Sequence, residues 1–292
     1  MDYIKKVSRA ISFIEKNLEQ EIRLSDIARK ACLSEFHFHR IFSALVGCSV
    51  GEYIRKRRLS RAAEELLVTR TRVIEIAVGY CFGSQESFTR AFKKQFGVNP
   101  AQYRKQKKRS FIFEKKEITE DYLLHLEGGL TMEPRIVTKE TFKVIGMQGR
   151  TTLKDNKIPQ LWQDFIPRME EIQNRTDKAV SYGICMVDPD FDIKDFTDTT
   201  EFTELVAVEV NNFDFVPQGM VTQVIERQKY AVFTHKGSLA NLRMTYDFIY
   251  GTWLHKSGME LAKTVDFEYY DSRRFNPIDQ ENSEFDIYIP IK

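Results

Sequence analysis

The first hundred residues contain one helical pattern twice, and this repeat limits the possible folds more than any other feature of the chain. Ile27-Ala28 and Cys32-Leu33 recur 49 residues later as Ile76-Ala77 and Cys81-Phe82. After one additional residue at Gly83 the offset becomes 50, and the further matched pairs are Ser34 and Ser84, Phe38 and Phe88, Arg40 and Arg90, Phe42 and Phe92, and Gly47 and Gly97. So many matched positions with one insertion at a turn indicate an internal duplication.

Each copy predicts two short helices joined by a tight turn. Apolar residues recur three and four positions apart, Ser34 is a suitable residue to begin the second helix, and Gly47 is suited to end it. This is the helix-turn-helix pattern, and we expect such units at about 24–46 and 73–96. The two cysteines at the turns, Cys32 and Cys81, are interpreted as small buried apolar residues rather than redox sensors.

An amphipathic stretch between the two copies predicts a connecting helix. Residues 50–67 would form a helix about 27 Å long, and an apolar stripe from Tyr3 to Ile14 predicts another helix before the first copy. A rod of that length could hold two recognition helices about one turn of DNA (~34 Å) apart. The N-terminal part is therefore predicted to be all-α.

Charge is divided unevenly along the chain although its net value is only +2. Residues 1–110 contain 23 Lys and Arg against 11 Asp and Glu, a net charge of +12, whereas the remaining residues have a net charge of −10. A basic N-terminal part suits a polyanion, because each Lys or Arg placed on a phosphate releases condensed counterions. The acidic remainder is expected to have a different task.

The composition places the chain in a reducing compartment. The start Met1-Asp2-Tyr3-Ile4-Lys5-Lys6 lacks a signal-peptide pattern, there is no long uncharged apolar run for a membrane span, and the four cysteines form no C-x-x-C pair. We therefore expect a soluble cytoplasmic protein that does not enter membranes.

Residues beyond about 130 change to a β-rich texture. Eight strands are predicted: 136–137, 142–147, 182–187, 205–210, 221–225, 230–234, 265–270 and 285–291. Helices are predicted at 159–173 and 239–255, and an 88-residue offset relates 142–149 to 230–237. Two strand-helix-strand-strand repeats would form an α+β domain with a pair of antiparallel sheets and a groove along their pseudo-dyad. We expect a DNA-binding domain at 1–107, a linker at 108–130 and a second domain at 131–292.

The second helix-turn-helix unit and its tail resemble the signature of AraC/XylS-type transcriptional regulators. The matching residues are Ile76-Ala77, Tyr80, Phe82, Ser84-Gln85, Phe88, Arg90, Phe92-Lys93, Phe96-Gly97, Pro100 and Tyr103-Arg104. The resemblance covers about residues 8–106. It implies a sequence-specific regulator that binds double-stranded promoter DNA and works with RNA polymerase.

The C-terminal half resembles the GyrI-like effector-binding domain. The matching segments are Pro134-Arg135-Ile136-Val137, Leu161-Trp162 with Phe165, Asp266-Phe267-Glu268 with Tyr270, and Glu284 to Pro290. The match extends over most of 130–292, and the domain order is similar to that of the Rob-like branch of the family. It implies control by a small effector, with multidrug sensing as one form of that control.

The outward faces of the two second helices are the candidate DNA-reading surfaces. The resemblance places contacts at Phe36, His39, Arg40 and Ser43 in the first unit and at Gln85, Glu86 and Arg90 in the second. An aromatic ring can contact a thymine methyl, Arg suits guanine, Gln suits adenine and Glu can accept from cytosine N4. The alternatives are that Phe36 belongs partly to the core, that Arg40 touches only phosphate, and that Glu86 is a helix N-terminal charge.

The connecting helix also contains a basic run. Lys56, Arg57, Arg58 and Arg61 either position this helix on phosphates or form an ordinary solvated face.

Glu268 is the candidate effector-binding residue. Alternation along its strand places it on one face with Asp266 and Tyr270. A carboxylate among aromatic rings suits a lipophilic cation, because it supplies the counter-charge while the rings add cation–π attraction. The candidate walls of the groove are Trp162, Trp253, Phe165 and Tyr182. The alternatives are a surface glutamate and ordinary core aromatics.

Other chemistries fit the sequence less well. The five histidines lack metal-ligand spacing and no phosphate-binding glycine loop is present, so we expect no metal or cofactor. Some GyrI-like proteins are hydrolases, and Glu268 could act as a general base in such an enzyme. A second alternative is a domain that binds only a protein, such as polymerase or gyrase. The fused DNA-binding half favours a non-enzymatic sensor.

Overall fold

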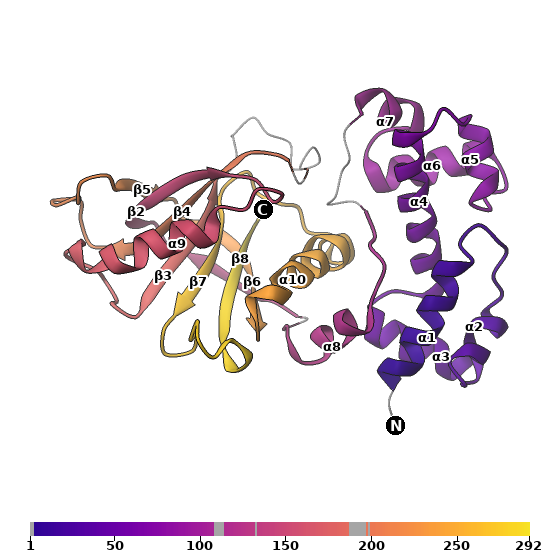
Figure 1. Cartoon of the computed structure of the whole chain (residues 1–292), viewed down its shortest axis with the longest axis horizontal. Helices are drawn as coiled ribbons and strands as arrows, with labels where there is room; N and C mark the ends of the chain where they lie inside the picture. The colour runs from indigo at the N-terminus through magenta and orange to yellow at the C-terminus, as the bar shows by residue number, and fades with distance from the viewer. Residues whose placement is uncertain (1–2, 108–113, 132, 187–196, 198) are drawn as a thin grey trace. The chain divides into compact units, whose positions relative to one another are not determined.

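Contacts divide the protein into two compact units. The computed structural model describes residues 3–107, 114–131, 133–186, 197 and 199–292 (Figure 1). Unit 1 contains the described residues up to Glu127 together with Tyr246–Trp253, and unit 2 contains most of the others. Among the described residues, no helix combines the length and the apolar composition needed to cross a membrane.

The described part of unit 1 is helical and contains both expected helix-turn-helix units. Its helices are α1 (Tyr3–Lys16), α2 (Leu24–Lys30), α3 (Glu35–Val46), α4 (Val50–Val68), α5 (Val73–Gly79), α6 (Gln85–Phe96), α7 (Pro100–Gln106) and α8 (Glu120–Gly128). Helices α2 and α3 form the first unit, α5 and α6 form the second, and α4 connects them. Residues assigned to the linker from sequence thus include helix α8.

The two helix-turn-helix turns are built alike. Cys32 and Cys81 have positive φ angles of 53° and 59°. The residue after each cysteine donates a backbone hydrogen bond to an alanine carbonyl, Leu33 to Ala28 at 3.1 Å and Phe82 to Ala77 at 2.9 Å. These bonds end α2 and α5 as Schellman motifs. The interpretation of Cys32 as a buried residue was wrong, since its side chain is exposed; the feature common to the two cysteines is the left-handed backbone.

The duplication extends to the helix caps and the aromatic core. Ser34 and Ser84 accept the hydrogen bonds of the first turns of α3 and α6, while Gly47 and Gly97 end these helices with φ of 75° and 76°. Matched aromatic triples fill the two cores: Phe38, Phe42 and Tyr53 in the first, and Phe88, Phe92 and Tyr103 in the second. A two-part core of this kind fixes the direction in which α3 and α6 present their outer faces.

The basic run of α4 is used inside unit 1. Arg57 is 8% exposed and its guanidinium pairs with Glu15 at 2.7 Å. The other three cations also have intramolecular partners: Lys56 pairs with Glu52, Arg58 donates to the carbonyls of Leu18 and Gln20, and Arg61 pairs with Glu64. The hypothesis that Arg57 contacts phosphate was wrong, because its side chain is buried against α1.

The chain after α7 returns along α4. Ser60 Oγ accepts a hydrogen bond from the backbone amide of Lys115 at 2.8 Å, and the Arg57 guanidinium donates to the Lys115 carbonyl. Within the same unit Lys116 Nζ lies 2.8 Å from Asp247 Oδ1, and Lys115 Nζ lies 3.2 Å from Thr252 Oγ1. These contacts explain why Tyr246–Trp253, expected in the second domain, groups with unit 1.

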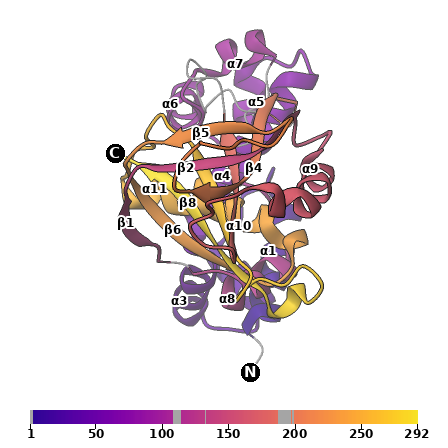
Figure 2. The ribbon, with the colours of Figure 1, turned by 90° about the vertical axis from the view of Figure 1, so that its left-hand side faces the viewer.

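Unit 2 contains the eight expected strands. They are β1 (Arg135–Lys139), β2 (Phe142–Thr151), β3 (Val180–Met186), β4 (Phe202–Val210), β5 (Val221–Ile225), β6 (Gln228–Lys236), β7 (Asp266–Asp271) and β8 (Glu284–Ile291). The helices between strands are α9 (Ile158–Phe165) with the 3₁₀ turn Ile166–Glu171, and α10 (Leu242–Phe248) followed by the π-helix Ile249–Trp253 and α11 (Leu254–Ser257). The predicted α+β fold is confirmed, and α9 packs on β2 and β4 (Figures 1 and 2).

The strands form one sheet rather than the predicted pair. Their order is β1-β6-β8-β7-β3-β4-β2-β5. One half of the sheet thus consists of β1, β6, β8 and β7, and the other half consists of β3, β4, β2 and β5. The halves join where β3 pairs with β7, because an unpaired central edge would leave backbone groups without partners. Strand β1 pairs with β6 of the second repeat and β5 pairs with β2 of the first, which interlocks the repeats. The β3–β7 junction is therefore the pseudo-dyad.

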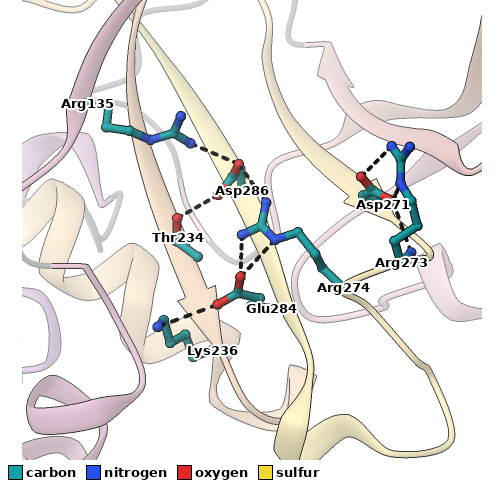
Figure 3. Close-up of polar contacts among 8 residues, drawn as sticks. All are labelled: Arg135, Thr234, Lys236, Asp271, Arg273, Arg274, Glu284 and Asp286. Atoms are coloured by element: carbon teal, nitrogen blue, oxygen red, sulfur yellow. Dashed lines mark hydrogen bonds and ion pairs between the residues drawn. The ribbon is translucent and has the colours of Figure 1, made fainter. Parts of the chain in front are cut away.

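A polar network ties β1, β6 and β8 to the β7–β8 connection (Figure 3). Asp286 is 4% exposed and lies 3.0 Å from Arg135, 3.3 Å from Arg274 and 2.6 Å from the Thr234 hydroxyl. Beside it, Arg274 and Lys236 pair with Glu284. Two of the segments that resemble GyrI-like domains thus contact each other, and the arginines compensate a buried carboxylate.

Candidate nucleic-acid interface and effector site

Helix α3 presents an exposed aromatic and cationic face. Phe36 is 73% exposed and therefore does not belong to the core. The Arg40 guanidinium lies 5.8 Å from the centroid of the Phe36 ring, and His39 is exposed on the same helix. Ser43 differs, because its hydroxyl is buried without a hydrogen-bond partner among the described residues. Ser43 would have to change rotamer before it could reach a base.

Helix α6 presents the equivalent face of the second unit. The predicted residues Gln85, Glu86 and Arg90 are exposed and line a hollow of about 720 Å³ together with Thr89, Lys93 and Lys94. The three additional residues were not selected from the sequence, although they follow Glu86 at the three- and four-residue spacing of one helix face. Two lysines near the end of α6, Lys93 and Lys94, add positive charge to this face.

Glu268 lies at the pseudo-dyad of unit 2. It is paired with Gly183 across the β3–β7 junction, and Tyr270 donates its hydroxyl hydrogen bond to Glu268 Oε2 at 2.6 Å. The Trp162 ring of α9 contacts the Tyr270 ring edge-on at a centroid distance of 5.4 Å. Burial and the Glu268 carboxylate raise the pKa of Tyr270 well above its usual value, so its hydroxyl remains a donor.

Gly183 of β3 lies between the side chains of this site. A Cβ atom there would lie 3.0 Å from Glu204 Oε1, 3.3 Å from Glu268 Oε2 and 3.6 Å from Trp162 Cζ2. Two carboxylates and an indole therefore converge on one spot that any larger residue on β3 would fill. Such a cradle can present negative charge and an aromatic wall to a cation.

Three of the predicted effector residues have other surroundings: one on the opposite sheet face, one in the core and one in unit 1. Tyr182 faces the opposite side of the sheet, since it precedes Gly183 by one residue, and its hydroxyl donates to Glu209 at 2.6 Å. Phe165 ends α9 and contacts the Trp162 ring edge-on at a centroid distance of 6.2 Å, but it is fully buried in the core. Trp253 is the last residue of the π-helix and belongs to unit 1. Within unit 2, the predicted residues that meet beside Gly183 are Glu268, Tyr270 and Trp162.

Glu204 is a further member of this site, and it was not predicted from the sequence. It lies on β4, where it pairs with Cys185, and is 5% exposed. Burial, followed by the charges of Glu268 and Asp266, raises the pKa of Glu204 well above its usual range. A glutamate directly before the apolar run Leu205–Val208 was the available signal, but it lies one residue before the predicted strand.

Comparison with known families identifies both units. A family model described as "Helix-turn-helix domain" matches residues 27–106, and one described as "Integron-associated effector binding protein" matches residues 135–291, more than half of the chain. AarP of Providencia stuartii, an HTH-type transcriptional activator, is 43% identical over 98 residues, which cover 34% of this chain and 73% of AarP. The chain belongs to the AraC family of transcriptional regulators. It has an integron-associated-type effector-binding domain after its DNA-binding domain.

Two further relatives of this AraC-family regulator differ in how much of their length aligns with it. The Right origin-binding protein of Escherichia coli is 29% identical, and the alignment spans the whole of both chains. The transcriptional regulator BrlR of Pseudomonas aeruginosa is 42% identical over 160 residues, 55% of this chain and 56% of BrlR. The chain thus matches about half the length of BrlR, whereas it aligns with the Right origin-binding protein from end to end.

Proposed function

We propose that α3 and α6 of this regulator read base edges in successive major-groove segments of a promoter. Phe36, His39 and Arg40 are the reading residues of α3, and Gln85, Glu86 and Arg90 are those of α6. The observation that carries this proposal is the pair of equivalent exposed faces on a duplicated, rigidly capped framework. The net charge of +12 over residues 1–110 supplies the attraction to phosphates.

The second part of the proposal is that unit 2 senses a small lipophilic cation at Glu268. Tyr270 holds the carboxylate in place and Trp162 offers a ring face or edge beside it. Phe165 serves the core, and Tyr182 is omitted because it faces away from Glu268. A cation that binds at this half-buried carboxylate gains a counter-charge in a medium less polar than bulk water.

Binding without turnover fits this site better than hydrolysis. The relatives are transcriptional regulators. We propose a non-enzymatic cytoplasmic sensor that acts with RNA polymerase, and a protein-only partner at unit 2 is the remaining alternative.

Calorimetric titration of the full chain tests the sensor proposal. The ligands are an aromatic monocation and a neutral analogue of the same shape. Wild type should bind the monocation more tightly, and Glu268→Gln should remove that preference because it keeps the shape but not the charge. Equal binding of the two ligands by wild type would favour the protein-only alternative.

A further inference from the structure

The carboxylates of the effector site differ in how they are satisfied. Glu268 accepts the Tyr270 hydroxyl, whereas no residue in the described part of the chain donates a hydrogen bond to Glu204 or forms an ion pair with it. Yet Glu204 is 95% buried and its Oε1 atom lies 3.0 Å from the Cβ position above Gly183. A buried carboxylate without a donor is unstable as an anion, so it either holds a proton or pairs with a bound cation.

Among the described residues, the groups that face Glu204 from each neighbouring element are acidic or neutral, and strand β2 places only Gly149 opposite it. Strand β7 contributes Asp266 and Glu268, whose charges raise the pKa of Glu204 further. Strand β3 contributes Cys185, whose own pKa is raised by burial and by the nearby acids, and α9 contributes Trp162. Burial, the lack of a described donor and the neighbouring acids all favour the protonated form of Glu204 when no cation is bound.

We propose that Glu204 is a second binding carboxylate and that the site takes organic dications in exchange for the Glu204 proton. The inference rests on the proposed sensor function at Glu268. A monocation is neutralised by Glu268 alone and leaves the proton on Glu204. With a dication the O–H bond of Glu204 breaks, the proton passes to the solvent buffer, and the second positive charge takes its place.

Distance defines the ligand class more closely. Because Glu204 Oε1 and Glu268 Oε2 both lie within 3.3 Å of one point, they are less than about 7 Å apart. The site therefore suits two cationic centres joined by a short aromatic spacer, with the ring against Trp162. The Trp162 indole beside the two carboxylates favours an organic cation as the occupant, because an aromatic ring attracts such cations.

Matched probes test this exchange on the full chain. Benzyltrimethylammonium has one permanent charge, and 1,3-bis(trimethylammoniomethyl)benzene has two on the same ring. Titration calorimetry in buffers of different ionisation enthalpy counts the protons released. We expect none for the monocation and about one for the dication, whose affinity should rise about tenfold per pH unit while Glu204 holds its proton.

Substitutions distinguish proton exchange at Glu204 from cation binding at Glu268. Glu204→Gln should abolish proton release and lower dication affinity at least tenfold, with monocation affinity changed less than twofold. The matched control is Glu209→Gln on the opposite face of the same strand, which should change neither. Dication binding without proton release in wild type would overturn the exchange even if Glu204→Gln failed to fold. A monocation affinity that Glu268→Gln leaves unchanged would instead overturn the sensor proposal.

Discussion

Arg40→Ala is expected to weaken specific DNA binding without destabilising the fold. The guanidinium is exposed, its one described interaction is the contact with the Phe36 ring, and Ala suits a helix as well as Arg does. The loss of an exposed cation–π contact costs about 0.5–1 kcal/mol of folding free energy. The loss of a bidentate guanine contact costs about 1–3 kcal/mol of binding free energy, or roughly 5- to 150-fold in affinity.

Fluorescence anisotropy with operator and random duplexes measures this effect. Arg40→Lys is the matched variant, because it keeps the charge and removes the two-pronged donor. Both variants should lose affinity for the operator and relax preference at one base pair, while Lys94→Ala should weaken binding to both duplexes and lower the salt slope by about 1. If Arg40→Ala weakened operator and random DNA equally, and Arg40→Lys restored both, Arg40 would be a phosphate contact.

Three further predictions concern the stability of the units. Ser60→Ala should lower the free energy of unfolding by about 1–3 kcal/mol in denaturant titration, because it leaves the Lys115 amide without its acceptor; no change would show that water replaces the hydroxyl. Asp286→Asn should cost about 2–3 kcal/mol and Arg135→Ala less than 1, since the aspartate is buried and Arg135 is mostly exposed; equal costs would refute this division. Glu204 binds its proton more tightly in the folded state, so above the pKa of an unfolded glutamate its contribution to stability falls as pH rises, by up to about 1.4 kcal/mol per pH unit. Thermal unfolding of Glu204→Gln should lack this slope, and an unchanged slope would exclude Glu204 as its source.

Local signals made most elements predictable from the sequence. Ser34, Gly47 and their repeats in the second unit bound α3 and α6 where cap chemistry requires, and the alternating runs located all eight strands. Strand order was not predictable in this way. The exchange of β1 and β5 between the repeats depends on pairings between segments about 80 or 90 residues apart, which no local pattern specifies.

The sites show the same division between local and distant causes. Alternation correctly placed Tyr270 beside Glu268, since both lie on β7. Tyr182 was chosen for its ring, but the register against β7 turns Gly183 rather than Tyr182 toward Glu268. The sequence left Arg57 either on phosphate or in a solvated face, because its true partner Glu15 lies 42 residues away and no local pattern reveals the pair. Glu204 could not be identified from the sequence, because only the pairing of β4 with β3 places its carboxylate near Gly183.

Transcription in a purified system tests the central claim that a cation bound in unit 2 controls a DNA-binding regulator. Run-off transcription from a promoter bound by the protein is measured with and without an aromatic cation, for wild type and Glu268→Gln. The account predicts that the cation changes transcript yield with wild type and not with Glu268→Gln, although both proteins bind the promoter equally. An equal response of the two proteins to the cation would contradict it.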